Sequence, residues 1–316
     1  MRNEGLFLLE WVAYHLTLGF DQIFIVTNDC TDGTDRLAQE LERLGHVTHV
    51  DNPLEEGVAP QISGMRKVLA MPGVKDLDWL LHIDADEFLN ITSSDGSIQS
   101  LVEIAGEADA MALLWRPFGD SGLERWDGGR VLETFLWSQG RPRTTNAQHK
   151  TMFRPQSFGA CIDHMPKAPV SDAVTVVNAR GEMCPSRALH HPTKSRFNLS
   201  QELLTWENAC INHYAIKSQD VFLLKNHRGD GMGRAGNKYH LNSTFYTRHN
   251  KNRRKEESIL RNKAAVDEWL ASFMANPVLH DLHQGALRAF RQLRGDVLTD
   301  EQIDAWTLDR SLAQEA

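Results

Sequence analysis

The stretch Trp79-Leu80-Leu81-His82-Ile83-Asp84-Ala85-Asp86-Glu87-Phe88-Leu89 decides how this chain is expected to fold. Its first five residues form a short run of apolar and aromatic side chains, which is typical of a buried strand. Two aspartates separated by one residue follow that run directly. We therefore expect an acidic loop at the carboxyl end of a core strand.

Strand and helix patterns alternate on the amino-terminal side of this stretch. The patterns predict helices over 5–19, 35–44 and 58–70, and strands over 22–27, 46–50 and 79–83. Such alternation implies parallel strands with helices on the faces of the sheet, and ligands bind beyond the carboxyl ends of those strands. The sequence thus predicts an α/β fold with a mostly parallel sheet, in which the acidic loop and the loop 28–34 share one edge.

The pattern beyond residue 100 is less regular. Residues 110–115 and 174–177 are predicted to be strands, and residues 117–150 to be loop with short elements. The tail from about residue 253 has apolar residues at helical spacing. We expect one domain over residues 1–250 and a helical C-terminal extension over residues 251–316.

The composition excludes several classes of protein. The chain has 316 residues, 41% of them hydrophobic and 24% charged, which excludes a disordered chain and a coiled coil. Its net charge of -8 disfavours nucleic acid as a partner, although it leaves room for a local basic patch. The 4 cysteines form no CxxC pair, so we expect free thiols and a reducing compartment. No apolar run is long enough to span a bilayer and the start has no apolar signal region, so we expect a cytoplasmic protein.

The pair Asp84 and Asp86 suits a hard divalent cation. Mg²⁺ and Mn²⁺ prefer oxygen ligands, and a bound diphosphate could supply those that two carboxylates leave open. A solvated acidic turn is the alternative for any bare DxD sequence. The apolar residues on both sides anchor this loop in the core and favour the cation.

The loop from Asn28 to Thr34 follows the first predicted strand. Asp29 at the strand end could accept a hydrogen bond from the N–H of a nucleotide base. The alternative is an Asx turn in which Thr31, Asp32 or Thr34 caps the next helix. Both interpretations can hold together, because different residues carry them.

These residues resemble a known family. Arg2-Asn3-Glu4, Leu8-Leu9-Glu10-Trp11, Tyr14-His15, the loop 28–34 and Ile83 to Phe88 are similar to family-2-like glycosyltransferases, and most of all to their family-92 branch. The resemblance implies a GT-A fold, a nucleotide-sugar donor (most often a UDP-sugar), a hydroxyl acceptor on a glycan or another molecule, and Mn²⁺ or Mg²⁺. It implies donor binding by Asn3, Glu4, Asp29 and Asp32, and a metal-binding DxD motif at Asp84 and Asp86. Such enzymes usually begin with a strand before the Asn-Glu pair, which this sequence lacks.

A second segment, Ile211 to Ser218 with Lys225 and Arg228, resembles a motif of related bacterial enzymes. His213 could be a third metal ligand. Lys217, Lys225 and Arg228 could bind a diphosphate and stabilise the leaving group. A buried histidine beside ordinary surface cations is the alternative.

The residues that would activate the acceptor are less distinctive. Asp163 could deprotonate an acceptor hydroxyl, with His164 as the other candidate. Trp115, Trp126 and Trp137 could stack on sugar rings, although aromatic residues in such a segment more often pack in a core.

The sequence therefore favours a metal-dependent glycosyltransferase that inverts the anomeric centre, as the resemblance implies. Two other classes stay open. One is a non-catalytic nucleotide- or carbohydrate-binding relic of the same fold, and the other is a phosphohydrolase that uses the first Asp of a DxD motif as nucleophile.

Overall fold

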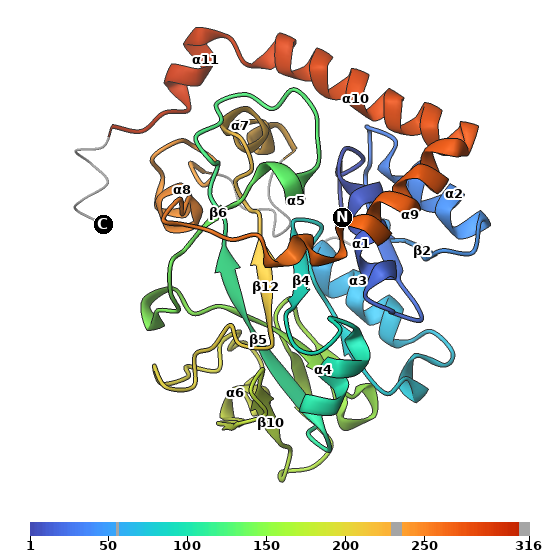
Figure 1. Ribbon diagram of the computed structural model, residues 1–316, viewed down its shortest axis with the longest axis vertical. Helices are drawn as coiled ribbons and strands as arrows, with labels where there is room; N and C mark the ends of the chain where they lie inside the picture. The colour runs from blue at the N-terminus through green and yellow to red at the C-terminus, as the bar shows by residue number, and fades with distance from the viewer. Residues whose placement is uncertain (55–56, 229–235, 310–316) are drawn as a thin grey trace.

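The computed structural model describes residues 1–54, 57–228 and 236–309 (Figure 1). At its centre the long strand β5 (Ala110–Pro117) pairs on both edges. One edge pairs with β10 (Val176–Asn178) near its start and with β12 (Ala209–His213) near its end. The other edge pairs with β7 (His149–Phe153). The sheet is completed by β4 (Glu87–Ile91), β3 (Leu80–Leu81) and β11 (Met183–Cys184).

The prediction of a mostly parallel sheet is wrong for this central sheet, which is mixed. The pairs β5–β10 and β5–β12 are parallel. The pairs β5–β7, β3–β7, β4–β12 and β10–β11 are antiparallel. The pairs β3–β7 and β4–β12 join strands far apart in the sequence, so no local pattern of side chains could have indicated their direction.

The predicted parallel unit exists at the amino-terminal side. Strands β1 (Phe24–Thr27) and β2 (Thr48–Asp51) form a separate two-stranded parallel sheet, with α2 (Thr34–Arg43) between them in the chain and α3 (Pro60–Leu69) after β2. Met1 lies on the other edge of β1, where its amino group donates to Val26 O and its carbonyl accepts from Asn28 N–H. α3 packs so closely that a Cβ added at Gly64 would lie 2.8 Å from a methyl group of Val26.

The strand predicted over 79–83 is shorter than expected. Only Leu80–Leu81 forms a strand, and both residues are half-buried. The fully buried strand of this stretch is β4, which begins at Glu87 immediately after the acidic pair. The acidic loop thus lies between β3 and β4, and it is the following strand that anchors it in the core.

Helix α1 (Leu8–Thr17) binds the free edge of β4 through side chains. The Trp11 indole N–H donates to Glu87 O at 2.8 Å, and the Tyr14 hydroxyl donates to Leu89 O at 2.9 Å. The His15 Nε2 accepts from Leu89 N–H at 3.4 Å. An unpaired strand edge exposes backbone groups that need partners, and here three side chains supply them.

The C-terminal tail is helical, as predicted. It contains α9 (Lys263–Ala275), α10 (Pro277–Val297) and α11 (Asp300–Ala305). α9 packs on α1 while α10 contacts α2 and α7 (Gln219–Arg228), and α10 runs along one border of the molecule (Figure 1). Val266, Phe273 and Leu279 belong to the same apolar core as α1 and β4.

The remaining elements are short. They are the helices α4 (Ile98–Ala105), α5 (Val131–Thr134), α6 (Arg187–His190) and α8 (Thr244–His249), and the strand pairs β6 (Trp137–Ser138) with β13 (Arg254–Lys255) and β8 (Phe158–Cys161) with β9 (Pro166–Pro169). The prediction of loop with short elements over 117–150 is confirmed. All four cysteines are free. Among the described helices, none combines the length and apolar character that crossing a membrane requires.

We expect Tyr14→Phe to lower the free energy of unfolding by about 1 to 2 kcal/mol, because it leaves the buried carbonyl of Leu89 without a donor. Urea denaturation would measure the loss. Tyr239→Phe is the matched control, since its hydroxyl makes no hydrogen bond within the described residues. Equal stability of the two variants would contradict the role of α1 at the β4 edge.

The same contact predicts a pH dependence. Burial lowers the pKa of His15 from 6.5 to about 4. Between these values the unfolded chain binds a proton that the native imidazole does not, so stability falls as the pH falls, by about 1.4 kcal/mol per pH unit. His15→Gln should reduce the slope of unfolding free energy against pH by this amount between pH 4.5 and 6. A slope in His15→Gln equal to that of the unmodified chain would contradict the prediction.

Candidate active site

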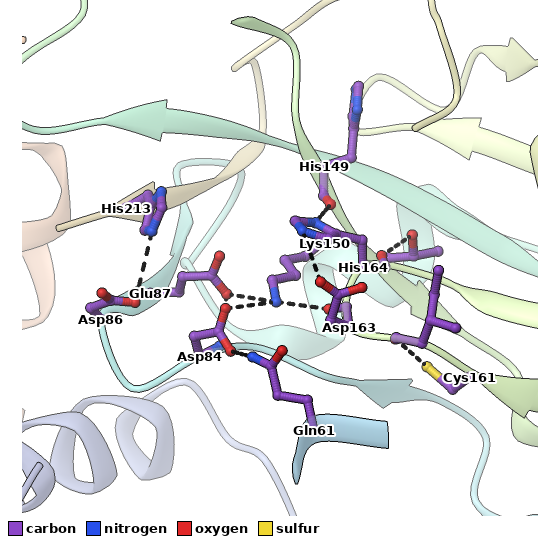
Figure 2. Close-up of polar contacts among 12 residues, drawn as sticks. Gln61, Asp84, Asp86, Glu87, His149, Lys150, Cys161, Asp163, His164 and His213 are labelled. Atoms are coloured by element: carbon purple, nitrogen blue, oxygen red, sulfur yellow. Dashed lines mark hydrogen bonds and ion pairs between the residues drawn. The ribbon is translucent and has the colours of Figure 1, made fainter. Parts of the chain in front are cut away.

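Asp84 and Asp86 border a cavity of about 1140 Å³ that lies between the β1–β2 unit and the central sheet. His213, Lys225 and Trp115 line the same cavity. The structure therefore brings together the three residues predicted to bind a metal ion, as Figure 2 shows for Asp84, Asp86 and His213.

Asp86 is surrounded by cations and one imidazole. The Lys225 Nζ donates to its Oδ2 at 3.0 Å and also to Ala215 O at 2.7 Å. The His213 Nε2 lies 3.7 Å from Oδ1 (Figure 2). Burial acts to raise the pKa of Asp86, but Lys225, His213 and Lys217 outweigh it and hold that pKa well below its ordinary value. Asp86 is therefore an ionised carboxylate.

Asp84 is held by a lysine from the neighbouring strand. The Lys150 Nζ lies 3.0 Å from its Oδ2, and the Gln61 side-chain amide donates to its Oδ1 at 2.8 Å. Burial raises the pKa of Asp84, but the ammonium of Lys150 overrides it and brings that pKa to about 2. This carboxylate is ionised as well, and its 32% exposed side chain faces the cavity.

Lys150 links the acidic loop 84–87 to the backbone of Asp163 and has no exposed surface. Its ammonium lies 3.3 Å from Glu87 Oε2 and donates to Asp163 O at 2.8 Å (Figure 2). Burial lowers its pKa, but Asp84 and Glu87 raise it above the ordinary value. The group is a permanent buried cation that fixes the acidic loop against β7.

The buried Glu87 side chain binds the backbone of the acidic loop. Its Oε2 accepts from Asp84 N–H at 2.7 Å, while Oε1 is buried with no partner among the described residues. Burial raises the pKa of Glu87 well above its ordinary value, against the effect of Lys150. This shift favours the neutral form of the Glu87 carboxyl. The positive charge of Lys150 is then left to balance the negative charge of Asp84.

His213 ends β12 inside an aromatic wall. Its ring centroid lies 4.0 Å from that of Trp115 and 5.4 Å from that of His249. Burial lowers the pKa of His213 to about 3, so the ring is neutral at physiological pH. A neutral imidazole can offer a lone pair to a metal ion.

The candidate base pair Asp163 and His164 lies on the same side of the cavity as Lys150. The His164 Nδ1 donates to His149 O at 2.9 Å, and its Nε2 lies 3.4 Å from Asp163 Oδ2. Burial lowers the pKa of His164. Both residues line the cavity, so a base role for either stays a prediction that the geometry allows.

The amino-terminal candidates divide into two groups. Glu4 is buried and lines the cavity. Asn3 accepts from Thr31 N–H at 2.8 Å, and Asp32 accepts from Gly5 N–H and Thr34 N–H, each at 2.9 Å. Asp32 thus forms the predicted Asx turn before α2. The predicted side-chain cap is wrong, because the N-cap residue is Gly33 and no side chain caps this helix. Asp29 is exposed with φ 45° and does not line the cavity, whereas its neighbour Asn28 does.

The basic candidates also differ. Lys225 binds Asp86 directly. Lys217 is buried, with φ 58° and its Nζ 4.5 Å from the centroid of the Phe7 ring, and it contributes to the low pKa of Asp86. Arg228 ends α7, and its side chain lies outside the described part of the chain.

The residues present suit a divalent cation that shares its coordination with substrate. Within the described residues, no group of three or more His, Cys, Asp or Glu side chains is arranged to hold a metal ion alone. An ionised Asp86 oxygen and a neutral His213 nitrogen nevertheless face each other, and Asp84 stands two residues away. Mg²⁺ is commonly bound by one or two carboxylates together with substrate phosphates, so this donor set fits.

The sequence analysis assigned no role to Lys150, Glu87 or Gln61. Lys150 could have been noticed as a charged residue inside the strand sequence His149-Lys150-Thr151-Met152-Phe153. A lysine that is fully buried in a strand needs a paired carboxylate. Nothing in the local sequence of Gln61 or Glu87 distinguishes them from ordinary helix and strand residues.

Comparison with known proteins gives distant relatives. Two proteins named glycosyltransferase family 92 protein, from Ricinus communis and Oryza sativa subsp. japonica, are each 23% identical to this chain, over 166 and 165 residues, or 51% of its length. A protein of that name from Arabidopsis thaliana is 26% identical over 165 residues, or 49% of the chain. The matches cover 29%, 27% and 27% of these relatives, so this chain spans less than a third of their length. No protein-family model matches the chain.

We expect Lys150→Met to lower the free energy of unfolding by about 3 to 5 kcal/mol, because it leaves buried carboxyl groups without their cation. Lys75→Met is the control, since within the described residues Lys75 donates to the carbonyls of Pro155 and Phe158 and to no carboxylate, and its loss should be smaller. Chemical denaturation at pH 7 measures both. A cost for Lys150→Met no larger than that of the control would contradict the assignment of Lys150 as the counter-charge of the site.

Proposed function

We propose that this protein is a GT-A-like glycosyltransferase that moves a sugar from a nucleotide-sugar donor to a hydroxyl acceptor with the help of Mn²⁺ or Mg²⁺. The observation that carries the proposal is the pair of ionised aspartates, Asp84 and Asp86, beside a neutral His213 and the ammonium of Lys225 in one large cavity. The names of the distant relatives support glycosyl transfer. The cavity has room for a donor and an acceptor together.

In this proposal Asp86 and His213 would hold the cation and Asp84 would assist them, while Lys150 and Gln61 fix the Asp84 carboxylate. When bound, the cation supplies positive charge that neutralises the diphosphate of the donor. Asp86 needs no proton removed before it binds, because its neighbours already keep it ionised.

The lysines of the site suit the leaving group. Lys225 reaches the cavity and carries a charge that Asp86 and Ala215 O orient. As the bond to the anomeric carbon breaks, negative charge grows on the diphosphate, and a fixed ammonium stabilises that charge without reorganising. Lys217 adds positive potential from its buried position.

The acceptor side would be formed by Asp163 and His164. A carboxylate at the cavity wall can take the proton of an acceptor hydroxyl while the oxygen attacks the anomeric carbon. One direct displacement of this kind inverts the anomeric centre. Trp115, whose ring contacts both His164 and His213, offers an aromatic face between the two halves of the site.

Calorimetry with UDP and UDP-sugars, with and without Mn²⁺, tests the donor site. We expect binding that Mn²⁺ strengthens, and loss of that effect and of transfer in Asp86→Asn, because the amide removes the charge that attracts the cation. Asp84→Asn should behave similarly. Asp95→Asn, which changes an exposed aspartate, is the control for the loss of one charge.

Other results would decide against the proposal. Normal transfer in both active-site variants would refute the metal assignment. Binding of nucleotide without turnover on any acceptor would favour the non-catalytic relic. Release of phosphate from a simple phosphate ester, with no dependence on a nucleotide sugar, would favour the phosphohydrolase.

A further inference from the structure

Outside the cavity, six cationic side chains lie on two distant segments, 141–143 and 248–254, and Arg143, Arg248 and Arg253 all act on the ammonium of Lys251. We call this group the basic patch; its members are Arg141, Arg143, Arg248, Lys251, Arg253 and Arg254. All are exposed except Lys251, which is half-buried. The patch stands out in a chain whose net charge is -8.

The backbone beneath the patch is fixed by hydrogen bonds. β6 and β13 pair antiparallel, with Arg254 opposite Ser138, and Arg253 N–H donates to Ser138 O at 3.0 Å. Asp120 accepts from the side-chain amides of Asn250 at 2.7 Å and Asn252 at 2.8 Å. β6 and α8 lie next to each other on one side of the molecule (Figure 1). The charges are therefore presented on a rigid support.

No ion pair within the described residues joins a member of the patch to a carboxylate, although Arg254 helps to lower the pKa of Glu256. The two neighbouring glutamates are bound elsewhere, Glu256 by Arg116 at 2.5 Å and Glu257 by Lys255 at 2.9 Å. Burial lowers the pKa of Lys251, and Arg253, Arg143 and Arg248 lower it further. Like charges held this close cost stability, and a bound anion would relieve that cost.

The patch adjoins the wall of the cavity. α8 carries Arg248, and the same helix places Phe245 in the cavity lining and His249 against His213. On the other segment, Gln139 N–H donates to Pro117 O at the end of β5, two residues beyond Trp115. The patch and the cavity therefore share helix α8.

We infer that the basic patch binds an anionic glycan, a sugar chain that carries carboxylate or phosphate groups. Arginine guanidinium groups bind both kinds of anion with two parallel hydrogen bonds. Trp137 on β6 is 41% exposed and lies opposite Lys255 in the strand pair, where an aromatic face is available to a sugar ring. The inference deepens the proposed function, because it takes this glycan as the acceptor.

The apolar surface favours a glycan over a membrane. Docking of a protein on a bilayer uses several apolar side chains together with cations. Trp137 is the one exposed large apolar side chain on β6, α8 or β13 among the described residues; the others are Leu54, Leu123, Val170, Met183 and Val278. A surface of arginines with a single aromatic residue suits a hydrated, charged polymer.

Titration of the full chain with labelled oligosaccharides tests the inference. The anionic probes are oligogalacturonate, which carries carboxylates, and phosphomannan fragments, which carry phosphates; neutral cello-oligosaccharide is the reference. We expect at least one anionic probe to bind more tightly than the neutral one, with an affinity that falls as salt rises. Arg143→Glu combined with Arg253→Glu should weaken that binding by at least about ten-fold, because four units of charge change beside the anion.

Arg288→Glu combined with Arg291→Glu makes the same charge change on exposed residues of α10 and should leave the affinity unchanged. Equal effects of the two double variants would overturn the inference, as would tighter binding to phosphatidylserine vesicles or to a single-stranded oligonucleotide. The assay needs neither donor nor turnover, and Asp86→Asn should keep full glycan binding. A failure of the proposed function is thereby distinguishable from a failure of the basic patch.

Discussion

Two buried ammonium groups make the acidic loop of this protein possible. Asp84 and Asp86 lie beside a cavity whose walls raise the pKa of a carboxyl, yet Lys150 and Lys225 hold both pKa values below the ordinary value. Each lysine is in turn fixed by a backbone carbonyl, of Asp163 and Ala215 respectively. The loop therefore presents negative charge to the cavity while the site as a whole stays close to electrical balance.

This electrostatic arrangement depends on how β4 is held. The loop continues directly into β4, whose backbone pairs with β12 on one edge and receives Trp11, Tyr14 and His15 on the other. The Asp86 carbonyl accepts from Tyr214 N–H at 2.8 Å, just beyond β12. α1 and β12 together thus fix the position of both aspartates. The residues Trp11, Tyr14 and His15 of α1 precede the acidic pair in the sequence and serve this purpose.

Local patterns predicted the parts of this fold that local interactions determine. The β1–α2–β2 unit, the helical tail and the acidic loop follow from apolar spacing and turn residues, and all are present. The direction of β7 and the pairing of β4 with β12 depend on contacts between distant residues, so the central sheet is mixed where parallel strands were expected. The role of Lys150 could not be predicted for the same reason: its carboxylate partners lie more than 60 positions away in the chain.

The site combines features that are individually common. A DxD loop, a buried histidine and a few lysines occur in many proteins, and the relatives share only 23–27% identity over about half of this chain. What gives the combination chemical meaning is its geometry: a neutral imidazole, two ionised carboxylates and one cavity-facing ammonium around a single space. The proposed cation binding, charge stabilisation and acceptor activation all depend on this arrangement.

Carboxyl-carbon NMR titration of Asp84 and Asp86 tests this central claim most directly. The account predicts that both side chains stay ionised as the pH is lowered through 3.8, with Asp84 titrating near 2. Titration of either residue at or above 3.8 in the folded protein would contradict it.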